Sequence, residues 1–269
     1  MLTYQSAINK LKEYAGDRIL IIQDFTDKDV IKFRDYLLTS LGNTPRTANN
    51  TIIHLNTLYR HLKDRVTIRE NPFKARKLKE AVTAKNIAFT DQDREAIERY
   101  MRNYDPELYI YIRFIYLAFI RPGELNAIQI NDIRLQEKYI LIRGAISKNG
   151  KTETVQMISS LLALISKMNL SRYDPFLYLF GSGLIPGKVI TGKQVAFRRH
   201  EKVLKSLQLH KKGYTLYSWK HTGAVNAYLS GVGIKQLQMM LRHSTVQMTD
   251  IYLKSLGLRT DPNIENYNW

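Results

Sequence analysis

The sequence predicts a mainly helical protein with one small antiparallel β-sheet. Two observations support this. Apolar residues recur along most of the chain at the three- and four-residue spacing of a helix face, whereas a stretch with strand character lies between Ile133 and Met157. A length of 269 residues with 44% hydrophobic residues is enough to build one large or two modest domains with real hydrophobic cores.

Residues 1–73 are predicted to form a small helical domain. Thr26 and Asp29 have the spacing of a capping box at the start of one helix, and Gly42 ends that helix. Three successive apolar faces follow helical spacing: Ile8, Leu11 and Tyr14, then Val30, Phe33, Tyr36 and Leu37, then Ile52, Leu55, Tyr59 and Leu62.

Polar residues on the third of these helices are candidates for DNA contact. Asn, Thr and basic side chains on an outer helix face can donate to phosphates or base edges, although an ordinary solvated face is the alternative. The face comprises Arg46, Thr47, Asn49, Asn50, His54 and Asn56. A basic linker, residues 74–88, follows Asn71-Pro72. Its cations suit a segment that lies along a DNA backbone or, alternatively, a solvated connector: Lys74, Arg76, Lys77, Lys79 and Lys85.

A second domain is predicted over residues 89–256. Thr90 and Asp93 cap its first helix, and the apolar run Leu108–Ile120 predicts a buried helix. Pro122 then suits the start of another helix. The sheet is predicted from three segments, Ile133–Leu135, Tyr139–Ile142 and Thr152–Met157, with a tight turn at Asn149-Gly150 between the last two.

Helical patterns resume after the predicted sheet and continue almost to the C-terminus. They cover Leu161–Met168, Val195–Leu207 and His221–Leu229, and a further helix carries Ile234, Leu237 and Leu241 after Gly231 and Gly233. Ser244 and Gln247 resemble a capping box for a last helix that bears Tyr252. Residues 257–269 are predicted to form a tail that folds back onto its own domain or, as the family resemblance given below implies, docks on a neighbouring protomer.

Charge and composition favour a nucleic-acid partner. The formal net charge is +17, and Lys and Arg outnumber Asp and Glu both before and after Lys85. Cysteine is absent, which excludes disulfides and thiolate metal sites, and the six histidines show no metal-ligand spacing. We therefore expect no metal and no cofactor. With no apolar run long enough to span a bilayer and no targeting segment, we expect a cytoplasmic or nucleoid-associated protein without a membrane partner.

The most informative feature is a tyrosine near the C-terminus that accompanies several dispersed cations. Tyr252 follows Leu241-Arg242-His243, which in turn follows Tyr217-Ser218-Trp219-Lys220-His221-Thr222. Upstream stand Arg121-Pro122-Gly123-Glu124-Leu125 and the turn Ser147-Lys148-Asn149-Gly150-Lys151. A phenol beside cations suits attack on a phosphodiester, because the negative charge that develops at phosphorus must be stabilised. With 17 tyrosines in the chain, only the set is specific.

The order and spacing of this set resemble the tyrosine recombinase (phage integrase) family. The resemblance covers about Thr90 to Leu256 and, more weakly, the N-terminal helices, which are similar to the family's core-binding domain. It implies a helical core-binding domain and an α+β catalytic domain. It also implies that Arg121 is the first clamp arginine, Lys148 the hairpin lysine, His243 the histidine of the Leu-Gly-His motif and Tyr252 the nucleophile.

Two positions depart from the family pattern. The motif His-x-x-Arg-His is here Tyr217-x-x-Lys220-His221, so a lysine replaces the second clamp arginine. It keeps the positive charge but loses the planar fork of donors. Arg242 replaces the glycine of Leu-Gly-His and, with Lys151, is a further candidate for DNA contact.

The resemblance implies a metal- and ATP-independent DNA strand transferase. Tyr252 would form a 3′-phosphotyrosyl link, Arg121, Lys220 and His243 would stabilise the transition state, and Lys148 would protonate the 5′-oxygen; His221 and Tyr217 both remain candidates for deprotonating Tyr252. The implied partners are a double-stranded recombination site and further protomers, a dimer on each site and a tetramer in synapsis, with an accessory DNA-bending protein as an option. We favour integration or excision of a bacterial or phage-encoded mobile element. The alternatives are a DNA-binding accessory protein with a weakened site and a type IB topoisomerase-like relaxing enzyme.

Overall fold

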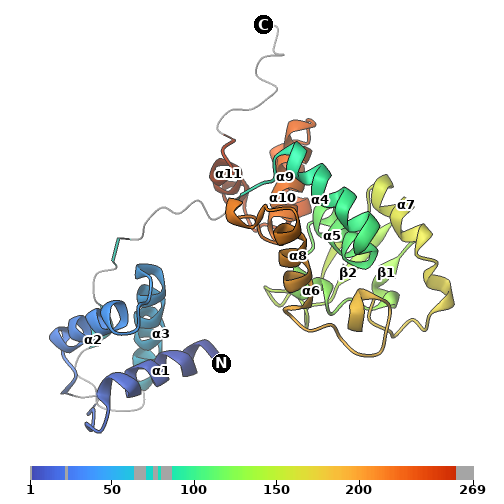
Figure 1. Ribbon diagram of the computed structural model, residues 1–269. Helices are drawn as coiled ribbons and strands as arrows, with labels where there is room; N and C mark the ends of the chain where they lie inside the picture. The colour runs from blue at the N-terminus through green and yellow to red at the C-terminus, as the bar shows by residue number, and fades with distance from the viewer. Residues whose placement is uncertain (1, 22–23, 64–70, 75–77, 80–86, 259–269) are drawn as a thin grey trace, which may run out of the picture. The chain divides into compact units, whose positions relative to one another are not determined.

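Separate hydrophobic cores organise the chain, which divides into the units Met1–Thr83 and Ala84–Trp269. The computed structural model of the protein describes residues 2–21, 24–63, 71–74, 78–79 and 87–258. A mainly helical chain with one small antiparallel sheet, as the sequence predicts, is confirmed (Figure 1).

The first unit packs three helices around a shared core. The described residues form α1 (Leu2–Ala15), α2 (Asp27–Thr39), α3 (Pro45–Lys63) and the short 3-10 turn η2 (Pro72–Lys74). The predicted capping box of α2 is present, because the Asp29 N–H donates to Thr26 Oγ1 and the Thr26 N–H donates to Asp29 Oδ2 at 2.9 Å. The core is built from the predicted faces together with residues from α1, α3 and η2: Ala7, Val30, Phe33, Leu37, Ala48, Ile52, Leu55, Tyr59 and Phe73.

One residue of the predicted polar face of α3 points the other way. Asn49 is buried, and its amide donates to the Leu78 carbonyl at 3.0 Å and accepts from the Leu78 N–H at 2.9 Å. An amide side chain offers a donor and an acceptor side by side, so it can satisfy both backbone groups of one residue. The expectation that Asn49 faces outward is therefore wrong. It ties the segment after η2 to α3.

The second unit surrounds a central apolar helix, α5 (Pro106–Ala118). Six of its residues are buried, which confirms the predicted core helix: Leu108, Tyr111, Ile112, Phe114, Ile115 and Ala118. Each apolar side chain buried in this way stabilises the fold by about 1.5–3 kcal/mol. Helices α4 (Asp91–Tyr104), α7 (Ser159–Lys167), α8 (Val195–Ser206) and α9 (Ser218–Leu229) pack against α5.

A three-stranded antiparallel sheet lies at one side of this core, in the order β1-β2-β3 (Figure 1). Its strands are β1 (Ile133–Arg134), β2 (Tyr139–Ile142) and β3 (Glu153–Gln156), and Ile140 pairs with both Ile133 and Val155. The connection between β2 and β3 covers residues 143–152, and the turn expected at Asn149-Gly150 lies within it, where the Gly150 N–H donates to the Ser147 carbonyl at 3.2 Å. The connection folds back on itself, where the Gly144 N–H donates to Thr152 Oγ1 at 3.0 Å.

Short elements link the sheet to the helices on either side. Between α5 and the sheet these are α6 (Pro122–Leu125) and η3 (Ile130–Asp132). Further short elements connect the later helices: η4 (Leu170–Arg172) and η5 (Ser182–Leu184) between α7 and α8, and η6 (His210–Lys212) between α8 and α9. Pro122 occupies the first turn of α6, where a missing N–H costs nothing because that group has no helical partner.

The last helices share a small core of their own. Helices α9, α10 (Ile234–Leu241) and α11 (Val246–Ser255) enclose Phe119, Ala224, Leu237, Leu241 and Leu253. Helix α9 begins at Ser218, three residues before the predicted start. Helix α11 is capped by Thr245, whose hydroxyl accepts the Met248 N–H at 3.2 Å, so the cap predicted at Ser244 is wrong. Among the described residues, no helix combines the length and apolar character needed to cross a membrane.

Candidate active site

Arg121 stands at the junction between the core helix and the short helix α6. The chain leaves α5 through Phe119, which has the left-handed conformation (φ 53°), and Arg121 is the N-cap residue of α6. Arg121 and Glu124, three residues apart, form an ion pair with 3.0 Å between Nη1 and Oε1. The Arg121 N–H also donates to Glu124 Oε2 at 3.2 Å. The guanidinium is thereby held at the edge of the core with 23% of the side chain exposed.

Glu124 connects three segments that are distant in the sequence. Besides Arg121, its carboxylate accepts the Lys148 backbone N–H at 3.3 Å and a guanidinium N–H of Arg242. Burial raises the pKa of Glu124, but the hydrogen bond and charge of Arg242 and the charge of Arg121 outweigh burial and hold the pKa below its ordinary value. Glu124 therefore stays ionised and fixes the start of α6, the β2–β3 connection and the end of α10.

Two side chains in the first turn of α9 anchor the helix to the rest of the unit, and the two residues between them belong to the candidate site. Trp219 is fully buried and its indole N–H donates to His200 Nε2 at 3.0 Å, while Thr222 Oγ1 accepts the Phe89 N–H at 2.8 Å. Residues three apart share a helix face, so the side chains of Lys220 and His221 project away from these anchors.

Lys220 is a buried cation among other cations. Its Nζ donates to the Phe119 carbonyl at 2.8 Å, and only 6% of the residue is exposed. Burial, followed by the charges of Arg121, Arg242 and Lys148, lowers the pKa of Lys220 to about 7, although Glu124 acts in the opposite direction. The side chains around Lys220 therefore carry more positive than negative charge. A phosphodiester would supply the missing negative charge and favour the protonated lysine.

Tyr252 on α11 lies against two histidines of the site, His221 and His243. Its hydroxyl lies 2.6 Å from His221 Nδ1, and the ring of His243 stands edge-on to the Tyr252 ring with 5.5 Å between centroids. Burial raises the pKa of the Tyr252 phenol. Burial first, and then the charge of Lys220, lowers the pKa of His221 to about 4. His221 is therefore neutral near pH 7. In the tautomer that carries its proton on Nε2, Nδ1 accepts a hydrogen bond from the phenol without removing the phenolic proton.

His243 is oriented by residues that the sequence did not single out. Its Nδ1 lies 3.0 Å from the hydroxyl of Thr249, which is fully buried, and its backbone carbonyl accepts from the amide of Gln238. Burial, then the charges of Lys220 and Arg121, lowers the pKa of His243 to about 4. Thr249 precedes Tyr252 by one helical turn, so their shared face is the signal that would have identified it.

Tyr217 is separate from this arrangement. It is 39% exposed, and its described ring contact is with Phe197, at 6.0 Å between centroids. Of the two groups that the sequence offered as partners for the Tyr252 proton, His221 is the one that touches the phenol.

Profile comparisons match both units to one family. The phage integrase family matches residues 88–257, and the phage integrase SAM-like domain matches residues 1–82. The chain belongs to the phage integrase family. It is an enzyme of the tyrosine recombinase class, which performs DNA strand exchange.

Curated relatives of this integrase-family chain span bacteria and archaea. Tyrosine recombinase XerA of Pyrococcus horikoshii is 25% identical over 231 residues, which cover 85% of this chain and 76% of that protein. A tyrosine recombinase of Thermosipho africanus is 25% identical over 257 residues, covering 93% and 86% respectively.

Solved structures share the fold of this integrase-family chain. The Tn1549 transposon integrase in complex with a circular intermediate DNA superposes with a TM-score of 0.74 at 18% identity, covering 98% of this chain and 92% of that one. A lambda integrase dimer bound to a core site gives 0.74 at 16% identity, covering 97% and 90%.

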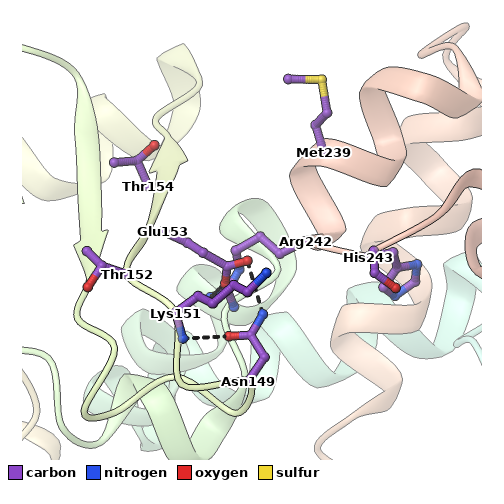
Figure 2. Close-up of a pocket in the computed structure, with 9 residues that line it drawn as sticks. Asn149, Lys151, Thr152, Glu153, Thr154, Met239, Arg242 and His243 are labelled. Carbon is purple, nitrogen blue, oxygen red and sulfur yellow. Dashed lines mark hydrogen bonds and ion pairs between the residues drawn. The ribbon is translucent and has the colours of Figure 1, made fainter.

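The candidate DNA-contacting residues of the second unit line a cavity beside the site. The cavity has a volume of about 500 Å³ and lies between the β2–β3 connection and the junction of α10 with α11. Figure 2 shows Lys151 and Asn149 on one side and Met239 and His243 on the other. Lys151 is exposed, whereas the Arg242 side chain is only 3% exposed and is held in ion pairs.

The candidate DNA-contacting residues of the first unit differ in exposure. Arg46, Asn50 and Lys74 are exposed. Thr47 and His54 are half-buried, with Thr47 Oγ1 at 3.0 Å from the hydroxyl of Thr44 and the His54 ring edge-on to Tyr4. Arg76 and Lys77, like most of the basic linker, lie outside the described residues.

Proposed function

We propose that the chain is a site-specific tyrosine recombinase that integrates or excises a mobile element through a covalent bond to Tyr252. The observation that carries this proposal is the short contact between the Tyr252 hydroxyl and His221 Nδ1, within a group of cations that one carboxylate aligns. A tyrosine buried only for packing would not need a neutral imidazole at 2.6 Å beside a buried ammonium group.

The proposed cleavage step balances as a transesterification. The phenolic oxygen of Tyr252 forms a bond to the scissile phosphorus, the bond from phosphorus to the 5′-oxygen breaks, and the DNA 3′-phosphate becomes linked to the enzyme. The phenolic proton passes to His221 Nδ1, and Lys148 supplies a proton to the departing 5′-oxygen. The energy of the phosphodiester is retained in the phosphotyrosyl bond, so the strand can be rejoined without ATP.

The surrounding cations lower the barrier by stabilising the charge that accumulates on the phosphorane oxygens. Arg121 would contribute a planar pair of donors, and Lys220 a buried point charge. His243 would donate from the nitrogen that Thr249 does not occupy. Removing one such preorganised donor from an enzyme site typically costs about a hundredfold to a thousandfold in rate.

The phenol is activated only when DNA arrives. In the DNA-free protein the high pKa of Tyr252 and the low pKa of His221 both oppose proton transfer. A bound phosphodiester places negative charge next to His221 and favours its protonated form. The phosphate that will be attacked therefore also promotes transfer of the phenolic proton from Tyr252 to His221.

We assign DNA binding to the first unit and catalysis to the second, with residues 74–88 as the connection. The SAM-like match over residues 1–82 supports this division of roles. Solved structures of a lambda integrase dimer bound to a core site and of a lambda integrase tetramer bound to a Holliday junction support pairing of protomers on DNA. We infer the same assembly here: a dimer on each recombination site and a tetramer in synapsis.

Trapping on a nicked duplex tests the covalent step. Cleavage next to the nick releases a short fragment and leaves the protein attached to DNA, where denaturing electrophoresis detects it. We expect adducts with the wild type and none with Tyr252→Phe at unchanged DNA affinity. The matched control, Tyr104→Phe, alters an exposed tyrosine of α4 and should behave as wild type. Tight binding by the wild type without any adduct would instead identify an accessory DNA-binding protein.

Exchange between marked substrates tests the finer assignment. Two duplexes with different labels should yield recombinant products if protomers assemble into a synaptic complex. Relaxation of supercoiled DNA without exchange would instead assign a topoisomerase-like activity. A donor circle that carries the element ends should be joined to a target. A preference for resolving joined dimers over this reaction would exclude the mobile-element assignment.

A further inference from the structure

Arg242 occupies a backbone position that does not suit it. It is the C-cap residue of α10 in the left-handed conformation, with φ 56° and ψ 48°. Glycine is the residue that adopts this conformation without a steric cost, and the family motif has glycine there. An arginine held in a disfavoured conformation beside a reactive centre calls for a functional explanation.

The side chain of Arg242 is directed into the site and not into solvent. From the end of α10 it reaches toward the β2–β3 connection, while His243 points the other way (Figure 2). The guanidinium donates to Glu124 Oε2, on the carboxylate that also holds Arg121, and its Nη1 lies 3.4 Å from Glu153 Oε2. The Arg242 Nε, which is buried, has no hydrogen-bond partner among the described residues. A buried donor in that state is costly until a ligand or water satisfies it.

Lys220 and Arg242 both depart from the family pattern. The positive charge of Arg242 is among those that lower the pKa of Lys220, so the two cations act on each other electrostatically. Position 220, on α9, has lysine where the family motif has arginine. Position 242, at the end of α10, has arginine where the motif has glycine. The site thus contains the same number of guanidinium groups as the motif, but one of them comes from a different element.

We propose that Arg242 supplies the second guanidinium of the phosphate clamp, in place of the arginine that Lys220 has displaced. This inference rests on the proposed function. Glu124 holds the guanidinium groups of Arg121 and Arg242 on separate oxygens, and Arg242 also lines the cavity of Figure 2. Two planar donor groups match the nonbridging oxygens of a phosphodiester, whereas the ammonium of Lys220 contributes a point charge.

Exchanging the two positions tests the inference. Single-turnover cleavage of the nicked duplex would be measured for wild type, Arg242→Gly, Lys220→Arg and the double variant. We expect Arg242→Gly to lower the rate about a hundredfold, as the loss of a preorganised donor does. Adding Lys220→Arg should return the rate to within about tenfold of wild type, because the guanidinium is restored from α9. Arg242→Lys should lose at least about tenfold, because charge alone does not replace the planar fork.

Two controls separate clamp chemistry from folding. Gln208 is an exposed residue that also has positive φ (58°), so Gln208→Gly relieves the same backbone conformation away from the site and should cleave as wild type. Melting temperature and DNA affinity would be recorded for each variant. If Arg242 only bridged Glu124 and Glu153, an arginine on α9 would not restore that bridge. Recovery of the cleavage rate in the double variant without recovery of its melting temperature therefore supports the clamp.

The results distinguish the two levels of the proposal. Wild type that binds DNA without forming adducts would overturn the proposed function. Wild type that forms adducts, with a double variant no faster than Arg242→Gly, would overturn the role of Arg242 and leave the function standing. Wild-type activity in Arg242→Lys would show that Arg242 acts as a charge that positions Glu124 and not as a guanidinium clamp.

Discussion

We expect the buried ammonium group of Lys220 to lower the free energy of unfolding, although the proposed chemistry depends on its charge. Replacing it with methionine keeps an unbranched chain of similar length but removes the buried ammonium group. The pKa of Lys220 falls from 10.5 to about 7 on folding, mainly through burial. At about 1.36 kcal/mol per pKa unit, this shift opposes folding by about 5 kcal/mol where both states are protonated.

The sign of the pH dependence follows from proton binding. Between pH 7 and 10.5 the unfolded chain holds the Lys220 proton and the folded chain does not, so wild-type stability rises with pH across this window. The full cost is present at pH 6, and about 3 kcal/mol of it has gone by pH 9, two units above the folded pKa. Lys220→Met also leaves the Phe119 carbonyl without its donor, which costs about 1–3 kcal/mol at any pH.

We therefore expect Lys220→Met to be more stable than wild type by about 2–4 kcal/mol at pH 6, with this advantage falling by about 3 kcal/mol at pH 9. Urea unfolding followed by tryptophan fluorescence measures the second unit, which contains both Trp219 and Trp269. Lys193→Met, at an exposed lysine, should show no such pH-dependent difference. An advantage of equal size at both pH values would refute the buried-charge explanation.

Two further predictions concern the placement and chemistry of α9. A Cβ added at Gly223 would overlap the Tyr116 carbonyl oxygen of α5, so Gly223→Ala should destabilise the second unit by about 2–3 kcal/mol; Gly123→Ala, where a Cβ meets nothing within 4 Å, should be neutral or slightly stabilising. Equal melting temperatures for these two variants would contradict the close packing of α9 on α5. His221→Ala should slow single-turnover cleavage by about a hundredfold or more, because the phenol loses the group that accepts its proton, whereas Tyr217→Phe should remain within a few-fold of wild type. The reverse ranking would transfer the proton-accepting role to Tyr217.

Much of the architecture was predictable because it depends on local patterns. The apolar run located the core helix α5, and the cap at Thr26 located α2. Errors arose where a tertiary contact decided the outcome. Asn49 turns inward because the backbone of Leu78, 29 residues further along the chain, satisfies its amide.

The sequence by itself determined the basic charge, the helical character of the chain and the types of residue available for phosphoryl chemistry, because these depend on composition and spacing alone. It also revealed that lysine and arginine stand at unusual positions of the motif. Only the tertiary structure decided that His221 and not Tyr217 touches Tyr252, that Lys220 is buried, and that Glu124 gathers Arg121 and Arg242. The physical reason is that hydrogen bonds and pKa shifts depend on distances of a few ångströms and on exclusion of water. Both are set by segments that are distant in the sequence, 31 residues apart for His221 and Tyr252 and 118 for Glu124 and Arg242.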